Sequence, residues 1–157
     1  QVEFRGRTPG VTHKGTFNGN PLVAASGVAA LSEIKTGKPN KLADAAAKRL
    51  RSGMRQVIEQ HQVTGAVYGE ASTFHLYLGD DVKGGSVEGL GAEKIRGIPK
   101  STISAMQSGL RKRGVDLMSH MSGVTSMAHT EADVDETLQA FEDTIQEMIA
   151  DGHIGGR

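Results

Sequence analysis

Apolar side chains recur along three stretches of the chain with the three-to-four residue spacing of an amphipathic helix. The stretches cover residues 41–61, 101–113 and 131–149, and Gly114 is a natural stop for the second. The apolar stripe is Leu42, Ala46, Leu50, Met54, Val57, Ile58 and His61 in the first stretch and Val134, Leu138, Phe141, Ile145 and Met148 in the last. The pattern predicts three helices that each bury one face and expose the other.

A fourth stretch, Leu22–Leu31, is apolar around nearly its whole circumference. Asn20 is a favourable N-cap for it, and Pro21 suits the first helical position because proline has no N–H to lose there. A helix without a polar face must be covered on several sides. Since a domain of this size could barely provide that cover, we expect protein outside this chain to do so.

Short strand signals lie between the predicted helices. Phe74, Leu76 and Leu78 alternate with polar or half-polar residues at a period of two, and shorter signals occur at 66–68, 115–118 and 124–127. We predict one small, mostly antiparallel sheet in an α/β domain, with the helices on one face and the 74/76/78 side chains toward them. The glycine-rich residues 79–97 show no periodicity, so we expect a long connection with little protection from hydrogen exchange.

Composition narrows the function classes. The 157 residues carry 18 lysine and arginine residues against 18 acidic residues, which argues against a nucleic-acid surface. Cysteine is absent, so disulfides, thiolate metal sites and cysteine nucleophiles are excluded. The apolar run at 22–31 is too short to span a membrane, and residues 1–10 do not resemble a signal peptide. These features predict a cytoplasmic protein that does not bind a membrane.

Generic catalytic motifs are missing. The six histidines, at positions 13, 61, 75, 120, 129 and 153, follow no metal-ligand spacing, and a structural role for His120 and His129 is favoured over metal binding. No P-loop and no Gly-x-Ser-x-Gly elbow occurs, and Lys94 stands where a dinucleotide motif beginning at Gly89 needs its third glycine.

One segment, Lys14–Pro21, combines small residues with a hydroxyl just before a predicted helix. Backbone N–H groups at a helix start, together with the Thr16 hydroxyl, suit an anion such as a phosphate. A plain loop with asparagine caps would have the same pattern, so both interpretations stay open from the residues alone.

The segment Thr12-His13-Lys14-Gly15-Thr16-Phe17-Asn18-Gly19-Asn20-Pro21-Leu22 resembles the His-x-Gly-Thr-x-x-Gly-Asn-Pro-Leu pattern of class III pyridoxal-phosphate aminotransferases, in particular the glutamate-semialdehyde aminomutase subgroup. Two later segments, 114–117 and Thr125–Asp135, are similar to the closing strand and helix start of that family. The resemblance covers nearly the whole chain but only about the last third of a complete family member.

The resemblance implies fold type I and a homodimer whose active sites lie at the subunit interface. It implies that Thr16, together with the N–H of Gly15 or Thr16, binds the phosphate of pyridoxal 5'-phosphate in the active site of the neighbouring subunit. It also implies three parts: residues 1–20 as a loop at the active site and interface, 21–40 as an interdomain helix and its break, and 41–157 as the C-terminal small domain.

Two departures from the family matter. The Schiff-base lysine lies upstream in a Lys-x-Ile-Gly-Gly-Gly-like context that no lysine of this chain has, so we expect no catalytic residue in this segment. Aminomutases carry glutamate near the substrate at the position of Met121, which here either lines an apolar substrate pocket or packs beneath a strand.

The sequence therefore favours the C-terminal portion of an aminotransferase that moves an amino group between an amino acid or amine and a carbonyl acceptor. It leaves two alternatives open: the aminomutase itself, and a non-catalytic dimerisation module.

Overall fold

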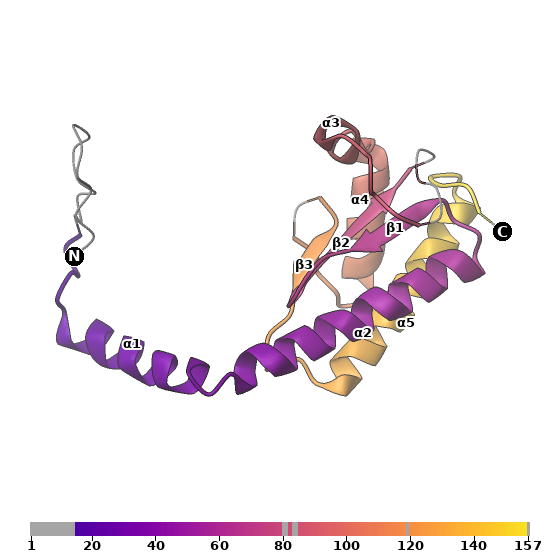
Figure 1. Ribbon diagram of the computed structural model, residues 1–157. Helices are drawn as coiled ribbons and strands as arrows, with labels where there is room; N and C mark the ends of the chain where they lie inside the picture. The colour runs from indigo at the N-terminus through magenta and orange to yellow at the C-terminus, as the bar shows by residue number, and fades with distance from the viewer. Residues whose placement is uncertain (1–14, 80–81, 83–84, 119, 157) are drawn as a thin grey trace, which may run out of the picture. The chain divides into compact units, whose positions relative to one another are not determined.

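The computed structural model describes residues 15–79, 82, 85–118 and 120–156. The chain divides into two compact units, Gln1–Gly37 and Lys38–Arg157 (Figure 1). The first 14 residues of the predicted loop lie outside the described part of the chain, and the boundary predicted at residue 20 stays a prediction.

The first unit contains helix α1 (Pro21–Ile34). Its N-cap is Asn20, whose side-chain Oδ1 accepts the N–H groups of Leu22 at 2.9 Å and Val23 at 3.3 Å. The predicted cap and the proline at the helix start are thus confirmed. No residue of α1 is buried, and Leu22 and Leu31 are 76% and 66% exposed. Within its own unit, α1 therefore has no buried face.

The second unit contains the three predicted amphipathic helices, α2 (Lys38–Gln60), α4 (Lys100–Lys112) and α5 (Glu131–Ala150). Helix α2 begins earlier than predicted because a first turn tolerates Pro39, whose missing N–H would be unpaired there. Helix α5 begins with a capping box. The Thr130 hydroxyl accepts the Asp133 N–H at 3.2 Å, and the Asp133 carboxylate accepts the Thr130 N–H at 2.7 Å.

Among the described residues, the sheet has three antiparallel strands, β1 (Gly65–Tyr68), β2 (Thr73–Leu78) and β3 (Ser122–Val124), in the order β1-β2-β3. Phe74 pairs with Gly123 across β2 and β3. A Cβ atom at Gly123 would lie 2.3 Å from the Phe74 ring, so only glycine allows this ring to lie over its partner strand.

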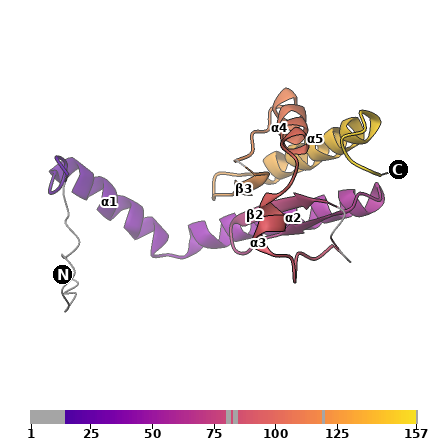
Figure 2. The ribbon, with the colours of Figure 1, turned by 90° about the horizontal axis from the view of Figure 1, so that it is seen from above.

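The hydrophobic core lies between the sheet and the three helices. Phe74, Leu76 and Leu78 are buried in it with residues from α2, α4 and α5, which confirms the predicted register. Helix α5 contacts both α2 and α4, and Figure 2 shows α4 and α5 side by side. The opposite sheet face is also covered, since Ala66 and Tyr77 pack against the segment around Val87 and Leu90.

The structure corrects two predicted strands. Residues 115–118 form no strand, and Met118 makes only a single bridge to Ser122, because the left-handed backbone at His120 and Met121 reverses the chain at once. The strand predicted at 124–127 begins at Ser122 and ends at Val124. Thr125 leaves the sheet because its hydroxyl donates to the Ala43 carbonyl at 2.7 Å, on α2.

Two smaller predictions also change. The connection predicted at 79–97 contains the short helix α3 (Ala92–Arg96), while residues 80, 81, 83 and 84 lie outside the described part. Leu42, predicted on the buried stripe of α2, is 46% exposed because the buried face at this end of the helix contains Ala43 and Ala47 instead. No helix within the described residues has the length and apolar character needed to cross a membrane.

Candidate functional site

The segment before α1 folds into two consecutive tight turns. The Asn18 N–H donates to the Gly15 carbonyl at 3.1 Å, and the Asn20 N–H donates to the Phe17 carbonyl at 3.0 Å. Gly19 has a φ of +77°, a conformation that glycine adopts without strain. A Cβ atom at Gly15 would lie 2.9 Å from Asn18 Oδ1, so the first turn also needs glycine at its start. Thr16 therefore lies at the tip of a locally determined turn.

The N-terminal N–H groups of α1 are not available to a ligand, contrary to the sequence-based expectation. The Asn20 side chain accepts those of Leu22 and Val23, and the Ala24 N–H donates to the Asn20 carbonyl at 3.0 Å. Pro21, being a proline, has no backbone N–H. An anion at this end of the chain must therefore be bound by the turn rather than by the helix start.

The turn itself offers donors that the described protein leaves unused. The Thr16 hydroxyl and the N–H groups of Thr16 and Phe17 make no hydrogen bond among residues 15–79, 82, 85–118 and 120–156, and Thr16 is exposed. No acidic side chain occurs within residues 15–20. One hydroxyl and two amides with no neighbouring carboxylate are a donor set that fits a phosphate group.

Met121 lies far from solvent in the second unit. Its side chain is fully buried in the core, and its carbonyl accepts the Leu76 N–H at 2.9 Å. The structure therefore places it beneath the sheet, and its part in a substrate pocket stays a prediction. Thr16 belongs to the first unit, so the two predicted site residues are not brought together within one unit.

The histidines form no metal site in the described residues, where no three histidine or acidic side chains gather. His129 instead closes a turn, since its Nδ1 accepts the Ser126 N–H at 3.0 Å. This bond requires Nδ1 to be unprotonated. The structural role favoured for His129 from the sequence agrees with this geometry.

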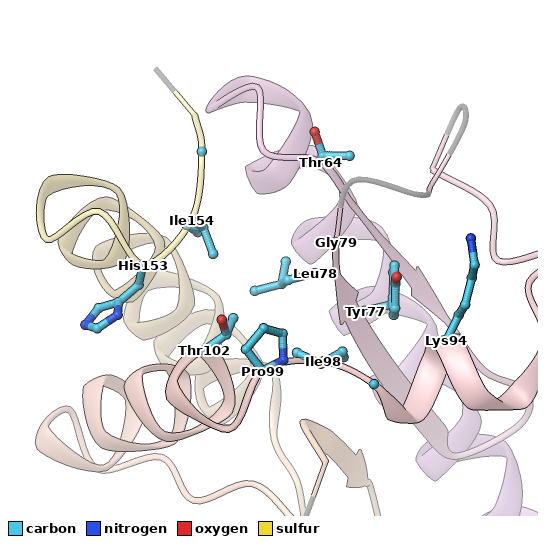
Figure 3. A pocket seen from close by; sticks show the side chains of 12 residues that line it. Thr64, Tyr77, Leu78, Gly79, Lys94, Ile98, Pro99, Thr102, His153 and Ile154 are labelled. Atoms are coloured by element: carbon cyan, nitrogen blue, oxygen red, sulfur yellow. The ribbon is translucent and has the colours of Figure 1, made fainter.

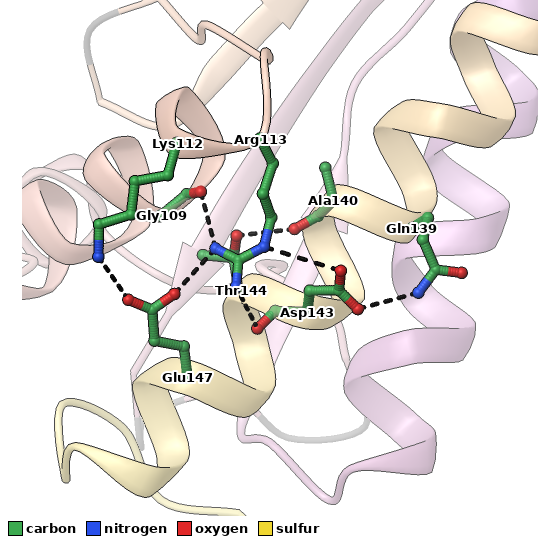
Figure 4. A network of polar contacts seen from close by, with 8 residues as sticks. All are labelled: Gly109, Lys112, Arg113, Gln139, Ala140, Asp143, Thr144 and Glu147. Carbon is green, nitrogen blue, oxygen red and sulfur yellow. Dashed lines mark hydrogen bonds and ion pairs between the residues drawn. The ribbon is translucent and has the colours of Figure 1, made fainter.

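A polar network fixes α4 against α5 (Figure 4). Arg113 donates to Glu147 Oε2 at 2.8 Å and to the Gly109 carbonyl at 2.9 Å, while Lys112 donates to Glu147 Oε1 at 2.6 Å. The two cations lower the pKa of the Glu147 carboxyl below its ordinary value, chiefly through the Lys112 hydrogen bond. The sequence placed the basic residues at the end of this helix but gave no sign of their partner, 34 residues away for Arg113.

Two further arginines hold the β1–β2 hairpin, and neither was anticipated from the sequence. Arg55 Nε donates to the Val67 carbonyl at 2.8 Å, and Arg51 donates to the Ala71 carbonyl at 3.0 Å. Both lie on α2, four residues apart, on the side that meets the sheet. That spacing was the available signal, because residues four apart share a helix face.

No protein-family model matches the chain. Curated relatives include the glutamate-1-semialdehyde 2,1-aminomutases of Pyrobaculum aerophilum, 33% identical over 140 residues, and of Methanopyrus kandleri, 26% identical over 140 residues. Each alignment covers 88% of this chain but only 32% and 31% of the relative, respectively. The chain thus spans about a third of the length of the curated relatives that it matches.

Solved structures show the same fold. An omega-transaminase from Sphaerobacter thermophilus matches with a TM-score of 0.68 and 23% identity, over 86% of this chain and 30% of that protein. A protein described as a transaminase with PLP bound matches with a TM-score of 0.71 and 21% identity, over 92% of this chain and 31% of that protein. The chain is thus similar in sequence to glutamate-1-semialdehyde 2,1-aminomutases and in fold to transaminases, as the counterpart of their C-terminal segment.

Proposed function

We propose that this chain forms the C-terminal portion of a pyridoxal-phosphate-dependent aminotransferase, which transfers an amino group between an amino acid or amine and a carbonyl acceptor. The proposal is supported by the similarity to aminomutases and transaminases over most of the chain. The observation that carries it is the turn at Gly15–Asn18, in which the Thr16 hydroxyl and the N–H groups of Thr16 and Phe17 make no hydrogen bond within the described residues.

In this proposal the turn holds the phosphate of the cofactor. Pyridoxal phosphate, when bound, supplies the electron sink that amino-group transfer requires. Thr16 donates its hydroxyl hydrogen and its N–H to phosphate oxygens, with the Phe17 N–H beside them. The Gly15–Asn18 turn and the Asn20 cap orient these donors before the ligand arrives, so little conformational entropy is lost on binding.

The proposed enzyme is a homodimer in which the turn serves the neighbouring subunit's active site. The apolar helix α1, which buries no residue, supports this, because a helix of that character needs cover from other protein. The lysine that binds the cofactor covalently and moves the proton is expected upstream of this segment. The proposed location is the cytoplasm, as expected from the cysteine-free composition and the short apolar run.

A second candidate is glutamate-1-semialdehyde 2,1-aminomutase itself, and the names of the curated relatives favour it. Against it stands Met121, an apolar, fully buried residue where the resemblance expects a substrate-binding glutamate. The two candidates differ in substrate. Turnover of glutamate semialdehyde without an added amino donor would establish the aminomutase, and dependence on an external donor and carbonyl acceptor would establish the transaminase.

The cofactor assignment is tested by Thr16→Ala in the full-length enzyme that contains this chain. A hydroxyl hydrogen bond to a charged phosphate contributes roughly 1.5–3 kcal/mol, so the substitution should weaken pyridoxal-phosphate affinity about ten- to hundredfold. Titrating the apoenzyme with the cofactor measures this. Because the proposed contact crosses the dimer interface, dimer stability in the presence of cofactor should fall as well.

Two matched variants separate this role from a structural one. Thr16→Ser keeps the hydroxyl and should retain most of the affinity. Ser32→Ala removes an exposed hydroxyl on α1 that donates only to the Val28 carbonyl, and it should change nothing. If Thr16→Ala binds the cofactor as tightly as the wild type and loses only stability, the phosphate assignment is wrong.

A further inference from the structure

The chain has two places where asparagine or aspartate directly precedes glycine, Asn18-Gly19 and Asp151-Gly152, and none of the roles above uses their chemistry. At such a place the backbone nitrogen of the glycine can attack the carbonyl carbon of the preceding side chain. Glycine favours this attack because it has no side chain to hinder the approach and adopts many backbone conformations. Asparagine is a thermolabile residue in proteins, and the reaction requires a glycine N–H that the fold does not hold.

At Asn18-Gly19 the attacking nitrogen is accessible. Both residues are exposed, and a Cβ atom at Gly19 would have nothing within 4 Å, so Gly19 faces open space. The Gly19 N–H makes no hydrogen bond among residues 15–79, 82, 85–118 and 120–156. The neighbouring N–H groups of Asn18 and Asn20 are bonded within the two turns. The fold therefore leaves in place the one backbone proton that this reaction has to remove and does not protect it.

Asp151-Gly152, at the end of α5, has the opposite arrangement. The Gly152 N–H donates to the Ile149 carbonyl at 3.1 Å, so its nitrogen is held by the helix end. The residues that follow are held as well. The His153 N–H donates to a helix carbonyl at 2.9 Å, and Ile154 packs against the core beside a cavity of about 670 Å³ (Figure 3). Of the two places, the structure leaves only the first open to attack.

We propose that Asn18 is a site of spontaneous deamidation, with water as the co-reactant. The Gly19 nitrogen forms a bond to Asn18 Cγ, the bond from Cγ to Nδ2 breaks, and ammonia leaves with the proton of the Gly19 N–H. Water then opens the resulting succinimide ring. Addition at Cγ breaks the bond from Cγ to the Gly19 nitrogen and gives aspartate. Addition at the backbone carbonyl carbon breaks the original peptide bond and gives isoaspartate, in which the chain continues through the side chain.

The modification changes the charge of the Thr16 turn. Both products place a carboxylate in a segment, residues 15–20, that otherwise has no acidic side chain. Asn18 Oδ1 already lies close to the start of the turn, because a Cβ atom at Gly15 would come within 2.9 Å of it. This consequence rests on the proposed function, in which the turn binds the cofactor phosphate. Since like charges repel, deamidation should weaken pyridoxal-phosphate affinity by about tenfold.

The first experiment follows the deamidation itself in the full 157-residue chain. The chain is incubated in mildly alkaline buffer, which helps the Gly19 nitrogen lose its proton, and peptide mapping by mass spectrometry locates each exchange of an amide for an acid. The other two asparagines of the chain are the internal controls. Asn20 precedes Pro21, which has no N–H to lose, and Asn40 lies within α2 before a bulkier residue. Asn18 should convert several times faster than either, and conversion no faster than that of Asn40 would overturn the proposal.

Two variants at the same position then separate the modification from its consequence. Asn18→Gln keeps an uncharged amide but would have to close a larger ring, so it should deamidate far more slowly than the wild type. Asn18→Asp carries the charge of the product from the start. In the full-length enzyme that contains this chain, Asn18→Asp should bind pyridoxal phosphate about tenfold more weakly than Asn18→Gln.

The outcomes distinguish this inference from the proposed function. Equal cofactor affinity of Asn18→Asp and Asn18→Gln, in an assay where Thr16→Ala has lost affinity, would overturn the effect of the new charge and leave the phosphate assignment standing. Wild-type affinity in Thr16→Ala would overturn the phosphate assignment and the consequence that rests on it. The peptide map decides the modification itself in either case, because it does not involve the cofactor.

Discussion

Helix α1 and the three long helices of the second unit obey the same local rules but have different surroundings. Helices α1 and α2 both carry a proline in the first turn, yet α1 buries no residue while α2 buries six. Helix α1 is held by local bonds, namely the Asn20 cap and the serine hydroxyls that donate to carbonyls four residues earlier. Helices α2, α4 and α5 are held by a shared core.

This difference in burial shows which surroundings an amphipathic helix and a helix with apolar residues on all sides each require. An amphipathic stripe is satisfied within its own unit, because one buried face is all that it requires. A helix of 14 residues with apolar side chains all round is marginal in water by itself, and such a sequence is useful only against other protein. The comparison predicts that core substitutions act strongly in the second unit and that equivalent changes in α1 act weakly in this chain.

The largest contrast is expected between Phe141→Ala and Val28→Ala. Phe141 is fully buried, so its truncation should lower the free energy of unfolding by about 3–5 kcal/mol, from lost apolar burial and the cavity left behind. Val28 is 66% exposed, so its truncation should change that quantity by less than about 0.5 kcal/mol. Urea unfolding followed by circular dichroism measures both. A large effect of Val28→Ala would show that α1 is already covered within this chain.

A smaller contrast is expected between two helical glycines. A Cβ atom at Gly109 would lie 2.5 Å from the buried Thr144 methyl group, a short branched side chain, so Gly109→Ala should destabilise the second unit by about 1–3 kcal/mol through overpacking. Nothing lies within 4 Å of the corresponding atom at Gly27. Gly27→Ala should therefore stabilise α1 by about 1 kcal/mol through helix propensity.

Thermal unfolding measures the first change, and helical circular dichroism at constant temperature measures the second. If the two alanine variants shifted stability in the same direction, the contrast in packing between α1 and α4 would be refuted.

The smallest effect concerns the α4–α5 network and appears as pH dependence. Lys112 and Arg113 lower the pKa of Glu147 in the folded state, so the folded chain binds a proton there less readily than the unfolded chain. The resulting stabilisation is fully present above the ordinary pKa of glutamate, about 4.3, and is lost as the pH falls through the lowered folded-state pKa.

Glu147→Gln should therefore show a shallower loss of stability below about pH 4.3 than the wild type does. Glu136→Gln is the matched control, because Glu136 is exposed on the same helix and makes no ion pair among the described residues. Unfolding curves at a series of acidic pH values provide the measurement. Identical slopes for wild type and Glu147→Gln would contradict the cause given for the pKa shift.

Local signals predicted the helix starts best. The Asn20 cap and the Thr130 capping box involve residues within three positions of each other, so their geometry follows from the sequence once a helix forms. The burial of Phe74, Leu76 and Leu78 followed from their alternation. The prediction of a strand at 115–118 was wrong. The same alternation can occur in an extended segment that, apart from the Met118–Ser122 bridge, pairs with no strand among the described residues.

In the candidate site, too, the sequence predicted what neighbouring residues determine and missed what depends on the folded backbone. The sequence singled out Gly15 and Thr16, and the turn that presents Thr16 is made of neighbouring residues. It did not indicate that Asn20 would use the helix N–H groups, because whether an asparagine side chain turns inward to its own helix or outward depends on the folded backbone.

The sequence by itself determined the helix limits to within a few residues, the buried face of β2, the absence of cysteine chemistry and the resemblance to class III aminotransferases. These features depend on residue type and on spacing along the chain. Only the tertiary structure decided the partners of Arg51, Arg55 and Arg113 and the full burial of Met121. Each of those depends on which distant segments pack together, and the spacing of residues along the chain does not specify that.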